Sequence, residues 1–144
     1  MIEQDTIRLL RECDAGVKMG VSSIDEVLKY VHSDTLKNIL QRCRDKHNTL
    51  DADLQKLLAK YKDEGKEPNP IAKGMSWMKT NMMLKMHESD ATIADLMTDG
   101  CNMGVKSLNK YLNEFEAADN DSKEICKRLI DLEEKLAIDI RRFL

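Results

Sequence analysis

The sequence of 144 residues contains little that could build turns or β-sheets. It has two prolines and six glycines, and aromatic residues make up only 4% of the chain. Leu, Met, Lys, Glu and Asp are abundant instead, which is typical of helical bundles rather than of β-proteins. The length corresponds to one domain that can bury a substantial core. We therefore expect a single all-α domain over residues 1–144.

The sequence also lacks a long apolar run, a surplus of positive charge and a secretory leader. No apolar run approaches the roughly 18 residues that suggest a transmembrane helix. The net charge of −3 gives no electrostatic reason to expect nucleic acid or an anionic membrane as the main partner. Because the first residues, M-I-E-Q-D, are acidic and polar, we expect a cytoplasmic protein by default.

The sequence contains no short motif typical of a catalytic or nucleotide-binding site. It has no phosphate-binding loop, no nucleophile elbow and no dinucleotide fingerprint. Its four cysteines, Cys13, Cys43, Cys101 and Cys126, lack the C-x-x-C spacing of zinc and redox sites. Three of them lie on apolar helical stripes and Cys13 lies beside one, so we expect buried free thiols in a reducing compartment.

What the sequence does contain is an internal repeat. Residues 16–31 match residues 100–115 at an offset of 84, and residues 39–58 match residues 125–144 at an offset of 86. The identical residues of the first match are Gly16/Gly100, Met19/Met103, Gly20/Gly104, Val21/Val105, Ser23/Ser107 and Leu28/Leu112. Between the two stretches a turn can absorb the change in offset. The repeat predicts two similar helical hairpins.

Apolar residues at spacings of three and four predict the helices of these hairpins. The stripe of the first helix is Ile7, Leu10, Val17, Val21, Ile24, Leu28 and Val31, with Asp14 in one slot. The second helix begins after a Ser33-Asp34 cap signal, and its stripe is Leu36, Leu40, Cys43, His47, Leu50, Leu54, Leu57 and Tyr61. The repeat offsets carry these stripes to Ala91, Ala94, Thr98, Cys101, Val105, Leu108, Leu112 and Phe115, and to Ser122, Cys126, Leu129, Glu133, Leu136, Ile140 and Phe143. The first hairpin is expected over about 3–63 and the second over about 90–144, with turns near 32–35 and 117–122. Between them, E-G-K-E-P-N-P-I must interrupt the chain, and residues 71–86 form an extra amphipathic helix in a long crossover over about 64–89. Two hairpins joined by a long crossover form a ferritin-like four-helix bundle.

Asp14, His47 and Glu133 fall on the predicted inner faces. His47 and Glu133 are equivalent in the repeat. Counting back from each turn puts Gly20 or Val21 level with His47, and Gly104 or Val105 level with Glu133. Three interpretations remain open at this point. The pair forms a buried hydrogen bond; or it binds a metal ion, with Asp14 or a water completing the site; or the inner faces are rotated so that one or both groups reach solvent.

A complete di-iron centre does not fit the sequence. Such a centre in a helical bundle takes a Glu from each of two helices and a Glu-x-x-His motif from each of the other two. The residue three before His47 is Arg44, and the residue three after Glu133 is Leu136. We therefore predict no catalytic residues from this sequence.

The expected crossover helix is rich in methionine and carries the only tryptophan. Its notable residues are Met75, Trp77, Met78, Met82 and Met86. Three roles are open for them: adaptable filler where the helix caps the bundle, a soft exposed patch for a partner or second subunit, and thioether binding of a soft metal such as Cu(I).

Several segments resemble a bacterial ferritin-like family of unknown function, which is distantly similar to rubrerythrins and bacterioferritins. They are C-D-A-G at 13–16, the proline break, I-A-K-G-M-S-W-M-K-T at 71–80 and D-G-C-N-M-G at 99–104. The resemblance covers nearly the whole chain and implies the ferritin-like fold and a link to metal or stress physiology. Such relatives bind iron through Glu and Glu-x-x-His sets. Only His47 matches a histidine position, and Glu133 takes the corresponding place in the other half.

These observations favour a non-catalytic bundle that binds a protein partner or associates with itself. The alternative is a degenerate metal-binding protein, linked to oxidative or metal stress, that holds iron or manganese through His47, Glu133 and Asp14. The first hypothesis locates function on a surface, and the second locates it in the bundle interior.

Overall fold

The structure, a computed structural model, describes residues 2–68 and 89–144. Within these ranges it is helical and contains no strand, which confirms the all-α prediction. The α-helices are α1 (Ile2–Leu28), α2 (Asp34–Lys60), α4 (Asp90–Glu114) and α5 (Asn120–Asp139), followed by a short 3-10 helix, η1 (Arg141–Phe143). The extra helix expected over 71–86 lies outside the described residues.

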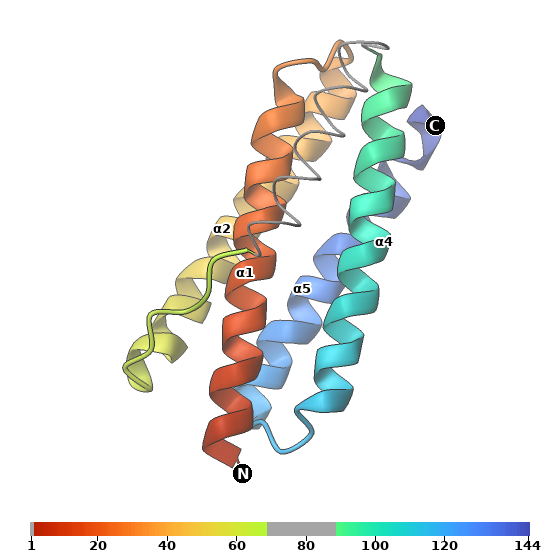
Figure 1. The fold of residues 1–144 in the computed structure, drawn as a ribbon. Coiled ribbons are helices and arrows are strands. Elements are labelled where there is room, and N and C mark those ends of the chain that lie inside the picture. Colours follow the sequence, from red (N-terminus) through yellow and green to blue (C-terminus); the bar gives the residue numbers. More distant parts are fainter. Residues whose placement is uncertain (1, 69–88) are drawn as a thin grey trace.

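The helices form two antiparallel pairs, α1 with α2 and α4 with α5, that lie side by side (Figure 1). Across the pairs, α2 packs on α5, and α1 packs on both α4 and α5. Helices α2 and α4 run in the same direction, so the end of α2 and the start of α4 lie at opposite ends of the bundle (Figure 1). No described helix is long and apolar enough to cross a membrane.

Side-chain caps explain where three of the helices begin. The Ser33 hydroxyl accepts a hydrogen bond from the Leu36 amide, which confirms the predicted start of α2. Ser89 caps α4 in the same way, and the Asp119 carboxylate caps α5 by accepting from the Ser122 amide at 2.8 Å. Each cap satisfies an amide of the first turn that has no partner within the helix.

The first helix ends three residues earlier than the periodicity predicts, at Leu28 rather than Val31. The amides of His32 and Ser33 donate to the two carboxylate oxygens of Asp90, at 2.8 and 2.9 Å, instead of to helix carbonyls. This contact comes from the start of α4 and bends the chain towards α2. A pattern within the first hairpin carries no information about it.

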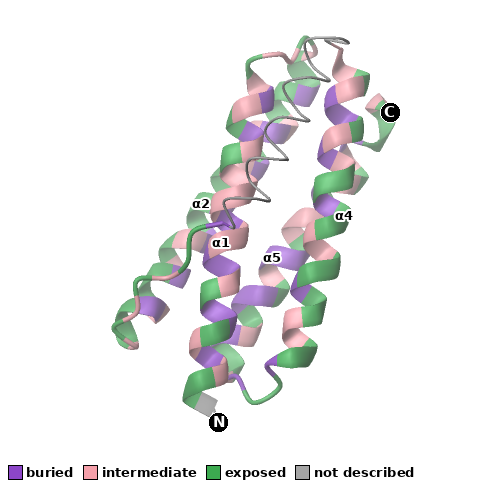
Figure 2. Cartoon of the chain, viewed as in Figure 1, coloured by how far each residue is buried: buried purple, intermediate pink, exposed green. Residues whose placement is uncertain are grey.

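The predicted inner face agrees with the observed burial for α2, and less well for the other three helices (Figure 2). In α1 the buried residues include Leu9, Cys13 and Val27, whereas the predicted Ile7, Val21 and Leu28 are only half-buried. Helix α1 packs on three other helices, so its buried face is wider than one seam. All four cysteines are free and buried, which confirms the burial predicted for them.

The apolar core divides into two clusters along the length of the bundle. One cluster contains Val17, Leu50, Leu108 and Leu129, and the other contains Ile24, Cys43, Cys101 and Leu136. Several residues between these two sets belong to neither cluster, and they include one on each helix that pairs across the bundle interior: Gly20, His47, Gly104 and Glu133. We call these four residues the belt. The belt interrupts the core at one level and contains two of the predicted site residues.

Candidate functional site

The belt pairs each polar side chain with a glycine, as the sequence predicts. A Cβ atom built on Gly20 would stand 2.8 Å from Nε2 of His47, and one built on Gly104 would collide with the Glu133 carboxylate. Only glycine leaves room for the imidazole in one half and for the carboxyl in the other. Each half of the bundle therefore places a glycine opposite a polar side chain, which is an imidazole in one half and a carboxyl group in the other.

His47 is 2% exposed, and its hydrogen bonds fix the form of its ring. Nδ1 lies 2.8 Å from the Cys43 carbonyl, which can only accept, so Nδ1 carries the proton. Nε2 is buried and has no hydrogen-bond partner among the described residues. Burial lowers the pKa of His47, and the bond to the Cys43 carbonyl opposes this shift. A neutral imidazole with a free lone pair on Nε2 results.

Glu133 is half-buried and makes no hydrogen bond to any described residue. Because burial disfavours the charged carboxylate, the pKa of Glu133 rises to about 8. The thiols of Cys43 and Cys101 lie near it, and burial first, then the Glu133 charge, raises the pKa of each to about 12. At neutral pH the belt is therefore essentially uncharged, and these thiols are not nucleophiles.

The structure does not bring the three predicted metal ligands together. Within residues 2–68 and 89–144, no three His, Cys, Asp or Glu side chains are close enough to one another to hold a metal ion. No hydrogen bond joins His47 to Glu133 in this part of the chain either. The belt supplies one imidazole and one carboxyl group at the same level, and Asp14 lies in a separate network.

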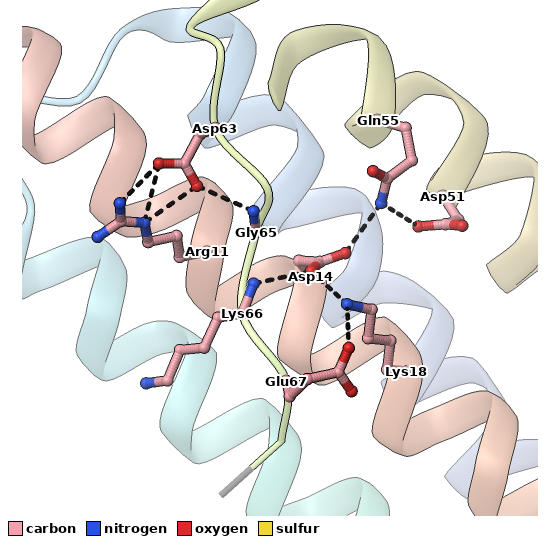
Figure 3. A network of polar contacts seen from close by, with 9 residues as sticks. All are labelled: Arg11, Asp14, Lys18, Asp51, Gln55, Asp63, Gly65, Lys66 and Glu67. Atoms are coloured by element: carbon pink, nitrogen blue, oxygen red, sulfur yellow. Dashed lines mark hydrogen bonds and ion pairs between the residues drawn. The ribbon is translucent and has the colours of Figure 1, made fainter. Parts of the chain in front are cut away.

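Asp14 is fully buried in α1, where it anchors the segment that follows α2 (Figure 3). Its carboxylate accepts hydrogen bonds from the Gln55 amide group and the Lys66 backbone amide, each at 2.9 Å. The ammonium group of Lys18 lies 2.9 Å from it. These three donors satisfy the buried charge without a metal ion.

We call residues 63–67, which cross α1 at Asp14, the strap. Gly65 has a φ of +84°, and a Cβ atom there would collide with the Asp14 carboxylate. Asp63 accepts from the Gly65 amide at 2.9 Å and pairs with the Arg11 guanidinium at 2.6 Å (Figure 3). The hydrogen bonds from Arg11 are the main cause that lowers the pKa of Asp63. In the sequence, Gly65 and Lys66 follow the acidic pair Asp63 and Glu64. The sequence does not show that this turn reaches Asp14.

A second candidate site lies on the outside of the bundle, between α2 and the end of α5. This groove of about 860 Å³, which we call the α2–α5 groove, is lined by Thr35, Asn38, Ile39, Arg42, Lys135, Ile138, Asp139, Arg141 and Arg142. Ile138 is 56% exposed, among the most exposed large apolar side chains described. The sequence predicts no groove at this place, although the Arg141–Arg142 pair and Arg42, which recurs as Arg128 in the repeat, were signals for it.

The predicted partner surface of the crossover helix lies outside the described residues. It consists of Met75, Trp77, Met78, Met82 and Met86. Their proposed exposure stays a prediction.

No protein family, curated protein or solved structure matches this sequence. The ferritin-like resemblance therefore stays a prediction.

Proposed function

We propose that this chain is a non-catalytic, ferritin-like bundle that binds a protein partner, or a second copy of itself, through the α2–α5 groove. One observation carries the proposal. Arg42, Arg141 and Arg142 line the groove, and none of them reaches a carboxylate within the described part of the chain. Arginine is enriched at protein interfaces, and the neighbouring isoleucines add apolar area to bury.

The ferritin-like arrangement is supported by the directions of the helices. In an up-down-up-down bundle, α4 would run opposite to α2, whereas here the two run the same way (Figure 1). A bundle of two hairpins with one long crossover has this property. Four free, buried thiols suit the reducing environment of the cytoplasm, which is the proposed location.

Single charge reversals test the proposed surface. Arg42→Glu and Arg141→Glu change the groove, and both side chains are exposed, so neither change removes a core contact. Arg8→Glu is the matched control, because Arg8 is exposed on α1 outside the groove. Self-association is measured by sedimentation velocity over a concentration series, and partner capture is quantified with each immobilised variant.

We expect both groove variants to lose the self-association or the capture that the wild type and Arg8→Glu share. A wild type that neither associates nor captures a protein would contradict the proposal. So would groove variants that behave like the wild type.

The second candidate function is metal binding in the belt, and the His47 ring is the observation that favours it. Its Nδ1–H donates to a backbone carbonyl and leaves the Nε2 lone pair free, as in many metal-binding histidines. Glu133 would supply a carboxylate after losing its proton, so binding would strengthen as pH rises towards 8. Asp14, the third predicted ligand, is already held by three donors.

Metal content decides this second candidate. The protein is made in iron- and manganese-supplemented cells, purified without chelators or a His-tag, and analysed by mass spectrometry. Near one equivalent of a single metal in the wild type, lost in His47→Ala and kept in Asp14→Asn, would support a site made by His47 and Glu133. Metal-free, folded protein would exclude it.

A further inference from the structure

We infer that the α2–α5 groove takes an acidic, amphipathic helix of a partner protein. This inference rests on the proposed function and adds the chemistry of the partner. Its basis is the combination, in one groove, of guanidinium groups that meet no carboxylate among the described residues with one exposed and one half-buried isoleucine.

The charge of the groove is opposite to that of the chain. Four cationic residues line it with one carboxylate, Asp139, and that carboxylate is already paired with Lys135 at 3.0 Å. The chain as a whole carries −3. An acidic partner would be attracted to this groove, whereas the overall charge would repel it elsewhere.

Three of the four arginines outside the groove, all but Arg8, show what these guanidinium groups lack. The pairs Arg11–Asp63, Arg44–Asp25 and Arg128–Asp53 are formed at 2.6, 2.9 and 3.0 Å. Arg42 and Arg141 have no such carboxylate among the described residues. A guanidinium group donates a planar pair of hydrogen bonds that matches a carboxylate, so Asp or Glu of a partner would complete the same pairing.

The shape of the groove fits a helix. Its walls are the first three turns of α2 and the end of α5 with η1, so an occupant would lie between two helices. Ile39 is half-buried and Ile138 is exposed. An amphipathic helix would cover these isoleucines with its apolar face and present carboxylates to the arginines on its flanks.

A neighbouring groove shows that the combination is specific. The groove between α1 and α2, of about 440 Å³, also contains lysines, but Lys18 pairs with Asp14 and Lys29 pairs with Glu26. Its cations are therefore already neutralised within the chain. The α2–α5 groove differs because Arg42, Arg141 and Arg142 meet no carboxylate among the described residues, although Arg142 lies over the Phe143 ring at 5.3 Å.

The test uses a synthetic peptide as the probe. A labelled, helix-forming peptide of about 15 residues carries a Leu stripe flanked by Glu, and its control has Lys in place of every Glu. Binding to the full chain is measured by fluorescence anisotropy. We expect the Glu peptide to bind, the Lys peptide not to bind, and binding to weaken as salt rises from about 0.05 to 0.5 M.

The same variants locate the peptide. Arg42→Glu and Arg141→Glu should each weaken binding by about tenfold, whereas Arg8→Glu should leave it nearly unchanged. Circular dichroism of each variant checks that the bundle is folded. Equal binding of the Glu and Lys peptides, or full binding to the groove variants, would overturn the inference.

Two further probes separate this inference from the proposed function. Inorganic phosphate or a single-stranded oligonucleotide that binds the groove and displaces the Glu peptide at lower concentration would make it a general anion site, and the inference would be wrong. If the Glu peptide fails while the groove variants still lose protein capture or self-association, the proposed function stands and only the acidic helix is excluded.

Discussion

Replacing Gly20 with alanine should fail to stabilise the bundle, although alanine is the better helix former. The added Cβ atom would stand 2.8 Å from Nε2 and 3.0 Å from Cδ2 of the His47 ring. The ring is 2% exposed, and its Nδ1 is held by the Cys43 carbonyl at 2.8 Å. To make room, either the ring must give up this hydrogen bond or the helices must move apart.

Gly100 calibrates the size of the effect. It lies in α4, and a Cβ atom there would meet nothing within 4 Å. Gly100→Ala should therefore show the helix-propensity gain alone, about 1 kcal/mol. Gly20→Ala has the same gain but also overpacks the core, which costs about 1–3 kcal/mol. The free energy of unfolding should be about 1–3 kcal/mol lower for Gly20→Ala than for Gly100→Ala.

Urea unfolding followed by circular dichroism measures this difference. His47→Ala removes the ring, so most of the overpacking cost of Gly20→Ala should disappear in that background. The double-mutant cycle of the two changes should give a coupling free energy of about 1–3 kcal/mol. If Gly20→Ala stabilises the protein as much as Gly100→Ala does, the His47 ring does not pack against Gly20, and the proposed arrangement of the belt residues is wrong.

Three further predictions concern the polar interior. Glu133→Gln should raise the free energy of unfolding at pH 7 by about 1–3 kcal/mol, because the pKa of Glu133 in the folded protein, about 8, exceeds its ordinary value of 4.5. The stability that the wild type gains from a neutral Glu133 is fully present below pH 4.5 and is lost as pH rises through 8. Burial lowers the pKa of His47 from 6.5, so the unfolded chain binds a proton at this residue more tightly than the folded protein does. The urea midpoint of Glu133→Gln should therefore fall as pH drops below 6.5, and the additional change His47→Gln should remove this fall. Gly65→Ala should cost about 1–3 kcal/mol in urea unfolding, through its positive φ and its collision with Asp14; a gain like that of Gly100→Ala would show that the strap is not docked.

Much of the fold could be predicted because the information is local and periodic. The stripe of α2, from Leu36 through His47 to Leu54, is buried as its spacing predicts. Offsets of 84 and 86 residues carried the same inner face to Leu108 and Leu129 of the second hairpin, and both are buried. The spacing of residues along a helix determines which of them share a face, and a repeat gives this information for both halves of the chain.

The partners of the polar residues could not be predicted, because they depend on contacts between distant segments. Asp14 falls on the apolar stripe of α1, and this position predicts a possible ligand of a site with His47. Its actual partners come from Gln55 in α2, from Lys18 one turn away and from the backbone of Lys66. No helical periodicity extends into the strap, where Gly65 turns with a positive φ. The early end of α1 has the same origin in the distant Asp90.

The belt and the α2–α5 groove are built on the same two helices, and this decides how they can be tested. Helix α2 turns His47 inward and Arg42 outward, five residues or roughly 7.5 Å apart along the helix axis. Helix α5 does the same with Glu133 and Ile138. Helices α1 and α4 contribute only glycine to the belt, so they supply space while α2 and α5 supply the polar groups.

Because the inner and outer faces of α2 and α5 are distinct, fold and function should respond to different substitutions. Belt changes such as Gly20→Ala act on packing and should shift unfolding without altering the charge of the groove. Exposed groove changes such as Arg141→Glu should alter association while the unfolding midpoint stays close to wild type. An Arg141→Glu variant that unfolds much more easily would mean that the guanidinium stabilises the bundle itself, and the surface proposed for a partner would then be part of the fold.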